Sequence, residues 1–355
     1  MKRRQFLAGA SLSVLAPYLS GDAFAQSNNA GLRNIAAKKG FRFGSAIDFD
    51  DVRDEHRAAL FIANVNSLTP RNDLKWTAVE KRPGVFEFGA ADAIVSFAIE
   101  NQMKIYGHTL IWYRVPGWVD KIDDEAGLRF AMERHIRAVM ARYKGKVDAW
   151  DVVNEPLEYD SAVMRQSVFQ KRLGDDYIRQ SFALAHQVDP DATLVLNETH
   201  LEKKADKFEK KRALILKVVE KVLASGTPIH AIGLQAHFRP GLDEVDEAGM
   251  GQFCRTLKDM GVGVFITELD ASCRFLKRAK GFSDSDYGDV FQKVVDVAAE
   301  NGTLKGVTVW GLSEKYAAPE TKNASGVCSK RINLFDENDD QRSTVDGIRR
   351  AIERL

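Results

Sequence analysis

Cysteine is scarce in this sequence, and long apolar runs are absent. Three of the 355 residues are cysteine, namely Cys254, Cys273 and Cys328. They form no Cys-x-x-Cys pair and no Cys/His cluster with metal spacing, so no metal site of that kind is expected. No apolar stretch is long enough for a transmembrane helix, and we therefore expect no membrane partner.

A strong net charge and a phosphate-binding loop are also missing. The formal net charge is +1 at pH 7, so the electrostatic footprint of a nucleic-acid-binding protein is not expected. No Gly-x-Gly-x-x-Gly follows the first expected strand, which argues against a dinucleotide-binding fold. The sequence thus predicts neither a nucleic-acid partner nor a cofactor.

The three cysteines have different expected environments. Cys254 lies in a helical pattern, where a buried, small apolar residue is expected. Cys273 and Cys328 both follow strand ends and could meet on one face, so a disulfide between them is a hypothesis. Equal free-thiol counts before and after reduction of the unfolded protein would exclude that disulfide.

The N-terminus has the three regions of an export signal in order. Lys2, Arg3 and Arg4 form a basic start, an apolar stretch runs from Ala8 to Leu19, and Ala23-Phe24-Ala25 offers a cleavage site. Adjacent arginines followed by Phe-Leu resemble a twin-arginine signal. We predict a cleavable signal at residues 1–25 and a mature protein that is periplasmic or secreted. The alternative is a disordered basic tail.

From residue 31 to residue 355, the sequence alternates between expected strands and amphipathic helices, without a linker. Most strands are short and rich in Val, Ile, Leu and Phe, which is typical of parallel strands buried on both faces. The expected strands are Phe41–Ile47, Val65–Thr69, Lys104–Trp112, Val147–Glu155, Thr193–Asn197, Ala231–Phe238, Gly263–Asp270 and Gly306–Leu312. The expected helices are Ala91–Asn101, Glu125–Tyr143, Asp175–Val188, Ala205–Ser225, Asp243–Met260, Tyr287–Asn301 and Thr344–Leu355. Eight such units predict an α/β protein made of one (β/α)8 TIM barrel.

Two glutamates follow apolar strands, Glu155 in the fourth and Glu268 in the seventh. A carboxylate at the end of a buried strand is costly to desolvate unless it has a partner or a function. The carboxyl ends of barrel strands converge on one mouth, where active sites form. Two carboxylates at that mouth indicate paired acid/base and nucleophile chemistry.

Other polar and aromatic residues stand at the same strand ends. Amides and imidazoles suit a ligand dense in hydroxyl groups, and indole faces suit the apolar face of a sugar ring, so we predict a carbohydrate cleft. The residues are Arg71, Asn72, Asp73, Lys75, Trp76, His108, Trp112, Asn154, Asn197, Glu198, Gln235, His237, Asp270 and Trp310.

Structural interpretations compete with these functional ones. The tryptophans, above all Trp150, could be core residues, and His108 and His237 could be core histidines with satisfied hydrogen bonds. Asn197 could cap the following helix, and Glu155 could form an ion pair with Lys75. A basic run on one expected helix is interpreted as a solvated outer face. It comprises Lys203, Lys204, Lys207, Lys210, Lys211 and Arg212.

These motifs resemble glycoside hydrolase family 10, whose best-known members are endo-1,4-β-xylanases. The similarity runs from about Phe41 to Asp336, with the same order and spacing. It is carried by Gly107–Trp112, Trp150–Pro156, Gly233–His237, Ile266–Asp270 and Trp310–Leu312. The resemblance implies a retaining glycosidase, with Glu155 as general acid/base, Glu268 as nucleophile, and carboxyl groups about 5–5.5 Å apart.

The resemblance also implies supporting residues. Asn154 is expected to bind the sugar 2-hydroxyl, and His237, with Gln235 beside it, is expected to keep Glu268 ionised. Trp310 should form a platform at the cleavage subsite. His108, Lys75, Asn72 and Trp112 resemble the family's contacts on the glycone side.

Three departures from the family pattern bear on substrate choice. Arg71 stands where the family commonly has glutamate, Tyr113–Pro116 replaces a His-Ser-Gln segment, and a second tryptophan is missing from Tyr316–Pro319. Because guanidinium groups suit carboxylate recognition, we hypothesise that Arg71 and Arg114 favour acidic branches on xylan.

The leading interpretation is a secreted, monomeric, retaining endo-1,4-β-xylanase that acts on a polysaccharide partner. A second enzyme interpretation keeps the mechanism but replaces xylan by another β-glycan or an exopolysaccharide. A third is a non-catalytic carbohydrate-binding barrel, which predicts the loss of one carboxylate, although both are present.

Overall fold

The computed structural model describes residues 31–239, 241–272, 283–316 and 331–355. The chain divides into residues 1–30 and the compact unit Gly31–Leu355. The predicted export signal at residues 1–25 and the predicted Cys273–Cys328 disulfide lie outside the described residues. Cys254 is buried, as expected, and burial raises the pKa of its thiol to about 12.

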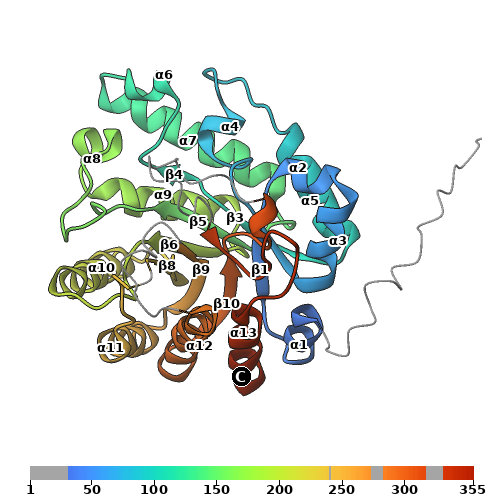
Figure 1. The fold of residues 1–355 in the computed structure, drawn as a ribbon. Helices are drawn as coiled ribbons and strands as arrows, with labels where there is room; N and C mark the ends of the chain where they lie inside the picture. Colours follow the sequence, from blue (N-terminus) through green and yellow to red (C-terminus); the bar gives the residue numbers. More distant parts are fainter. Residues whose placement is uncertain (1–30, 240, 273–282, 317–330) are drawn as a thin grey trace, which may run out of the picture. The chain divides into compact units, whose positions relative to one another are not determined.

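Within the described residues, eight parallel strands form a closed barrel at the centre of the fold (Figure 1). The ring closes because β10 pairs with both β9 and β1. A short β11 (Arg331–Ile332) pairs antiparallel with the end of β9. The barrel strands are β1 (Phe43–Ile47), β2 (Ser67–Pro70), β3 (Lys104–Gly107), β5 (Ala149–Asn154), β6 (Thr193–Glu198), β7 (Ala231–Leu234), β9 (Gly263–Ser272) and β10 (Leu304–Val309).

Two predicted continuous strands are interrupted in the structure, so their predicted extents were wrong. The predicted Lys104–Trp112 strand consists of β3 and β4 (Ile111–Trp112), and the predicted Ala231–Phe238 strand consists of β7 and β8 (His237–Phe238). In the second interruption Ala236 has a φ of 60°, in the left-handed region that L-residues rarely adopt. Both interruptions fall where polar side chains leave the sheet for the barrel mouth.

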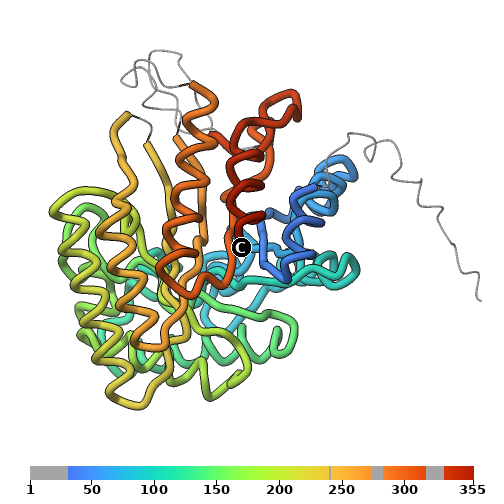
Figure 2. Tube along the Cα trace, turned by 90° about the horizontal axis from the view of Figure 1, so that it is seen from below, coloured from blue at the N-terminus to red at the C-terminus, as the bar shows by residue number. Residues whose placement is uncertain are grey.

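The seven predicted helices surround the strands (Figure 1), because each buries one apolar stripe against the sheet. Figure 2 shows α11, α12 and α13 side by side in chain order from yellow to red, with α1 (Leu32–Lys38) next to α13. The predicted helices are α5 (Gly89–Glu100), α7 (Glu125–Tyr143), α9 (Asp176–Val188), α10 (Asp206–Ala224), α11 (Glu247–Asp259), α12 (Asp284–Asn301) and α13 (Ser343–Arg354).

Helix α11 begins four residues later than predicted, for a reason visible in its capping. The side chain of Asp246 accepts a hydrogen bond from the backbone N–H of Gly249 at 2.9 Å, which is the N-cap arrangement. The predicted first residue, Asp243, is instead engaged by Lys203 at 2.9 Å. Polar side chains with long-range partners thus decide this boundary.

The helix between the first two strands was missed in the sequence. This helix, α3 (Glu55–Asn64), buries only Leu60 and Phe61, so its apolar pattern is weak. The other unpredicted helical segments are short. They are α1 (Leu32–Lys38), α2 (Phe49–Arg53), α4 (Trp76–Val79), α6 (Gly117–Asp120), α8 (Val168–Leu173) and the 3-10 turn Glu314–Tyr316.

The interior of the barrel is filled by a small cluster of side chains separate from the larger core between strands and helices. The small cluster comprises Tyr106, Ala149, Val195, Ala231 and Phe265, one from each of five strands. The larger core includes Trp150, which is fully buried as its structural interpretation predicted. A Cβ atom at Gly107 would approach the Trp150 ring to 2.2 Å, so this glycine makes room for the indole.

The interpretation of the basic run as one solvated face is wrong for three of its members. Lys203, Lys211 and Arg212 are buried, and each pairs with an acidic side chain, respectively Asp243, Glu198 and Asp246. On α10, Lys211 and Arg212 occupy positions of the inward stripe that also holds Phe208 and Ile215. The long-range acidic partners that make this burial possible are not visible in the local pattern.

Among the described residues, no helix combines the length and apolar character needed to cross a bilayer.

Candidate active site

Glu155 directly follows β5, in a backbone conformation that turns the chain out of the sheet. Its φ is 52° and its backbone N–H donates to the carbonyl oxygen of Asn197 on β6 at 2.8 Å. A non-glycine residue in this region costs about 1–3 kcal/mol, and such residues cluster at functional sites. The side chain is 13% exposed, and its Oε2 lies 3.5 Å from a guanidinium nitrogen of Arg165.

Glu268 lies inside β9, and its carboxylate is almost fully buried. One oxygen, Oε1, accepts a hydrogen bond from Nδ2 of Asn197 at 2.9 Å, and the other lies 3.0 Å from Nε2 of His237. The second ring nitrogen of His237 lies 2.7 Å from Oδ1 of Asp270. Because residues two apart on a strand share a face, Glu268 and Asp270 hold this imidazole from the same side of the sheet.

Three amide side chains connect the two glutamates. Nε2 of Gln235 lies 3.2 Å from Oε1 of Glu155 and 3.3 Å from Oδ1 of Asn154. Nδ2 of Asn197 donates to that same Asn154 oxygen at 2.9 Å and also to Glu268. A continuous hydrogen-bonded chain therefore runs between the two carboxylates across three neighbouring elements of the barrel.

Asn197 is therefore not the helix cap that one structural interpretation proposed. It is fully buried within β6, and its Oδ1 accepts a hydrogen bond from Oγ1 of Thr267 at 2.7 Å. A Cβ atom at Gly233 on the neighbouring strand would lie 2.3 Å from that oxygen. The glycine thus creates the space that the Asn197 amide occupies.

The two carboxyl groups have pKa values displaced in opposite directions. Burial raises the pKa of Glu155, and the negative charges of Glu198 and Glu268 raise it further. Burial also acts to raise the pKa of Glu268, but the hydrogen bond with His237 and the nearby cationic groups outweigh it, so that pKa is lowered. The site therefore favours a protonated Glu155 beside an ionised Glu268.

His108, at the end of β3, is fixed by a buried acid. Its Nδ1 lies 2.7 Å from Oδ2 of Asp151, while the hydroxyl of Tyr106 donates to the other oxygen at 2.6 Å. Trp310 meets the rings of His108 and His237 edge-on, with centroids 5.3 and 6.2 Å away. The two predicted histidines and the predicted tryptophan thus come together around Glu268.

The residues after β2 form a second chain of contacts. Nζ of Lys75 donates to Oδ1 of Asn72 at 3.1 Å, and the Asn72 amide donates to Asp48 at 3.0 Å. Lys75 also lies 4.8 Å from the ring centroid of Trp112. Among the described residues, the cation within ion-pair distance of Glu155 is Arg165, so the structure does not show the Glu155–Lys75 ion pair that was the alternative to a functional Glu155.

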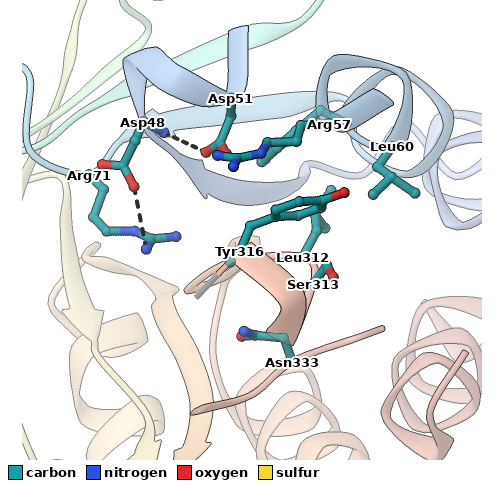
Figure 3. Close-up of a pocket in the computed structure, with 11 residues that line it drawn as sticks. Asp48, Asp51, Arg57, Leu60, Arg71, Leu312, Ser313, Tyr316 and Asn333 are labelled. Carbon is teal, nitrogen blue, oxygen red and sulfur yellow. Dashed lines mark hydrogen bonds and ion pairs between the residues drawn. The ribbon is translucent and has the colours of Figure 1, made fainter. Parts of the chain in front are cut away.

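Arg71 belongs to a small pocket between the ends of β1 and β2 and the segment after β10 (Figure 3). Its NH1 lies 3.4 Å from Oδ2 of Asp48. On the opposite side, Arg57 contacts Asp51 at 3.3 Å and stacks over the ring of Tyr316 at 4.2 Å. Both guanidinium charges in this pocket are therefore compensated by carboxylates of the protein itself.

Sequence reasoning overlooked Arg165 and the role of Asn197. Arg165 donates from Nε to the backbone oxygen of Glu155 at 3.0 Å and packs over the Tyr113 ring at 4.2 Å. It lies in an irregular segment with no periodic pattern, so no local signal identifies it. Asn197 does stand at a strand end, and that position was the available signal.

A closed (β/α)8 barrel with two glutamates at its mouth, connected by hydrogen bonds through side-chain amides, defines a glycoside hydrolase of the two-carboxylate kind. The glycosyl hydrolase family 10 model matches residues 31–351, and the chain belongs to this family.

Several relatives match most of the chain. It is 34% identical over 287 residues to a beta-1,4-xylanase of Dictyoglomus thermophilum, covering 78% of each sequence. It is also 34% identical over 307 residues to endo-1,4-beta-xylanase 2 of Claviceps purpurea, covering 86% of each. Xylanase 10B of Thermotoga petrophila, solved in complex with xylobiose, is similar with a TM-score of 0.81 and 26% identity. That match covers 92% of this chain and 98% of the other.

Proposed function

We propose that this protein is a retaining endo-1,4-β-xylanase that hydrolyses internal bonds of xylan. The observation that carries the proposal is the pair of glutamates at the barrel mouth, connected by hydrogen bonds through Gln235, Asn154 and Asn197. The opposite directions of their pKa shifts agree with an acid and a nucleophile. The names of the relatives support xylan as the polysaccharide. The predicted carboxyl separation of about 5–5.5 Å stays a prediction.

In the first step Glu268 is the nucleophile and Glu155 the acid. An ionised Glu268 oxygen attacks the anomeric carbon while the bond to the leaving oxygen breaks. That oxygen takes the proton of Glu155, so the leaving sugar departs as a neutral alcohol. The product of this step is a glycosyl ester on Glu268 beside an ionised Glu155.

In the second step the roles of the two carboxyl groups reverse. Glu155, now ionised, removes a proton from a water molecule, whose oxygen attacks the same carbon and expels the Glu268 carboxylate. Two inversions return the β configuration and restore both protonation states. His237, which contacts Glu268 at 3.0 Å, favours its ionised form in the free enzyme.

The remaining predicted residues are proposed to bind the sugar chain. Asn154, which directly precedes the acid in sequence, is proposed to bind the 2-hydroxyl of the sugar that reacts, and the half-buried ring of Trp310 is proposed to support that sugar. The glycone side is proposed to contact His108, Lys75, Asn72 and Trp112. Hydroxyl groups of the chain would replace water around these polar side chains.

A polysaccharide panel tests the choice of substrate. The purified protein should release short β-1,4-linked xylose oligomers from several xylans. It should release reducing sugar from β-glucans at least about tenfold more slowly, because an extra hydroxymethyl group must be accommodated at every subsite. Mass analysis of the products measures this preference. Faster release from a β-glucan or an exopolysaccharide would support the second enzyme interpretation and contradict xylan as the substrate.

We further propose export of the protein through the signal at residues 1–25. The basic start, the apolar stretch and the Ala23-Phe24-Ala25 site support this proposal. N-terminal sequencing of the protein from the periplasm or medium tests it, since the mature chain would begin just after Ala25.

Of the two arginines, Arg114 rather than Arg71 is proposed to bind acidic branches of xylan. This exposed guanidinium lies 5.0 Å from the Trp112 ring centroid, and its Nε donates to the Tyr113 hydroxyl at 3.0 Å. No carboxylate of the described residues pairs with it, whereas Arg71 is paired with Asp48. Stacking holds the cation in place, ready for a carboxylate on the substrate.

Replacing Arg114 by alanine is expected to lower kcat/KM on glucuronoxylan about two- to fivefold, the range of an exposed ion pair. Hydrolysis of neutral arabinoxylan should not change. Arg71→Ala is the matched comparison, and its effect should be the same on both polymers because its charge is already compensated. Equal wild-type rates on both xylans, unchanged by Arg114→Ala, would contradict the hypothesis.

A further inference from the structure

Glu198 is a buried carboxylate that the proposed mechanism does not use, although it lies next to Glu155. It is the last residue of β6 and is fully buried. Oε1 accepts from the backbone N–H of Thr199 at 2.7 Å and from its hydroxyl at 3.0 Å. The same oxygen lies 3.0 Å from Nζ of Lys211, which is also fully buried. Four different donors therefore reach this one side chain when the contact of its second oxygen is included.

That second contact connects Glu198 to the segment carrying Glu155. Oε2 accepts a hydrogen bond from the backbone N–H of Leu157 at 2.9 Å, two residues beyond Glu155. The backbone oxygen of Glu198 accepts from the backbone N–H of Gln235 at 3.2 Å. The side chain of Gln235 in turn contacts Glu155. Glu198 is thus connected to Glu155 in two ways, through Leu157 in the segment after Glu155 and through Gln235 at the end of β7.

A buried ion pair of this kind is an inefficient way to stabilise a fold. The loss of hydration of both ions offsets most of their attraction, and well-packed apolar residues are often as stable. An apolar pair could neither accept the hydrogen bond from the Leu157 N–H nor place a fixed charge near Glu155. The placement therefore indicates a task connected with Glu155.

We propose that Glu198, held by Lys211, is a positioning residue that fixes the turn at Glu155 and keeps that carboxyl in its acid form. This inference rests on the proposed role of Glu155 as general acid/base. A negative charge close by disfavours a second negative charge on Glu155. The effect expected from the charge of Glu198 has the same direction as the pKa shift of Glu155, which burial raises most and the charge of Glu198 raises further.

Other charged groups also face Glu155, from every element packed around it. Arg165 contributes a compensating cation from the segment after β5, and Lys75 acts on Glu155 from the segment after β2. Glu268 adds a second negative charge from β9. Lys211 of α10 pairs with Glu198, and the charge of Glu198 also acts on Tyr177 of α9. Of these groups, Glu198 and Lys211 can be neutralised without removing a group that contacts Glu155.

The test is the pH dependence of kcat/KM in the full-length enzyme, with an aryl β-xylobioside whose leaving group needs protonation. Activity is lost at alkaline pH as the acid loses its proton, so that limb reports the acid. Glu198→Gln should move the limb to lower pH and reduce kcat/KM about threefold or more at a fixed pH on it. Lys211→Met should move the same limb to higher pH, because Glu198 then acts uncompensated. The double variant should lie between them.

Glu80→Gln is the matched control. Glu80 is fully buried and accepts from Nε1 of Trp76 at 2.9 Å and from the backbone of Gly84 at 2.7 Å, and Arg134 is its cationic partner. Its neutralisation should change the melting temperature but not the alkaline limb. If Glu198→Gln does not fold, Lys211→Met provides the same test with the opposite sign.

Two outcomes separate this inference from the proposed function. If Glu155→Gln removes the alkaline limb while Glu198→Gln and Lys211→Met leave its position unchanged and only lower kcat at every pH, Glu198 is purely structural and the inference is overturned. If the wild-type protein shows no glycosidase activity, or the limb survives in Glu155→Gln, the proposed role of Glu155 fails first.

Discussion

Alanine in place of Glu268 is expected to lower kcat for xylan hydrolysis by about 10⁴-fold or more, the range seen when a catalytic nucleophile is removed. No other carboxylate of the described residues is hydrogen-bonded both to Asn197 and to His237, so no neighbour can take over the attack. Release of reducing sugar measures the loss. Glu80→Gln, which neutralises a buried carboxylate paired with Arg134 rather than with Asn197 and His237, should retain near wild-type kcat.

The space left by Glu268→Ala also allows a chemical test of its role. Azide should enter that space and attack an activated aryl β-xylobioside from the face opposite the leaving group, giving the α-glycosyl azide in a single inversion. Nuclear magnetic resonance of the product identifies the anomer. Unchanged release of reducing sugar by Glu268→Ala would mean that these glutamates carry no chemistry and would favour the non-catalytic barrel.

Alanine in place of Glu155 is expected to lower kcat on xylan by about 10²- to 10⁴-fold, the usual contribution of a general acid/base. The loss should depend on the leaving group. A dinitrophenyl glycoside needs no proton to depart, so its first step should stay fast while the second step, which lacks its base, becomes slow. A burst of dinitrophenol and a glycosyl ester on Glu268, detected by mass spectrometry, are the expected observations.

Azide distinguishes this variant from Glu268→Ala. In Glu155→Ala the glycosyl ester still forms, and azide attacks it from the side where Glu155 stood, so two inversions give the β-glycosyl azide. The alkaline loss of activity should also disappear, since the group with the raised pKa is gone. An α-azide from Glu155→Ala, or an equal loss for good and poor leaving groups, would contradict the assignment of the acid.

The barrel and its two glutamates were accessible from sequence because each depends on a short, local pattern. Apolar strands alternating with amphipathic helices predict the (β/α)8 fold, and that fold brings Glu155 and Glu268 to one mouth. The strand interruptions were not accessible. Around His108 the chain leaves the sheet because the N–H of Leu110 and the hydroxyl of Thr109 both bond to the carbonyl oxygen of Asp151, a contact over 40 residues away.

The supporting residues depend on partners from distant parts of the chain. Asn197 was interpretable as a helix cap because a local pattern cannot show that Asn154 and Glu268 converge on it. Lys211 has the sequence environment of a surface lysine. Its burial is explained by Glu198, thirteen residues earlier and on another element, together with the Thr199 hydroxyl and the backbone oxygen of Tyr159. Arg165 has no periodic context at all, so its contact with Glu155 becomes visible only in three dimensions.

The amide chain from Glu155 to Glu268 has a consequence for protein engineering. All of its members stand on or immediately beside barrel strands, while the residues proposed to read substrate branches, such as Arg114, lie in connecting segments. Libraries that randomise residues 114–116, and keep Tyr113 because its ring packs against Arg165, should therefore alter which polymers are accepted without changing the catalytic residues. The same division would let substrate specificity change while the catalytic residues stay the same.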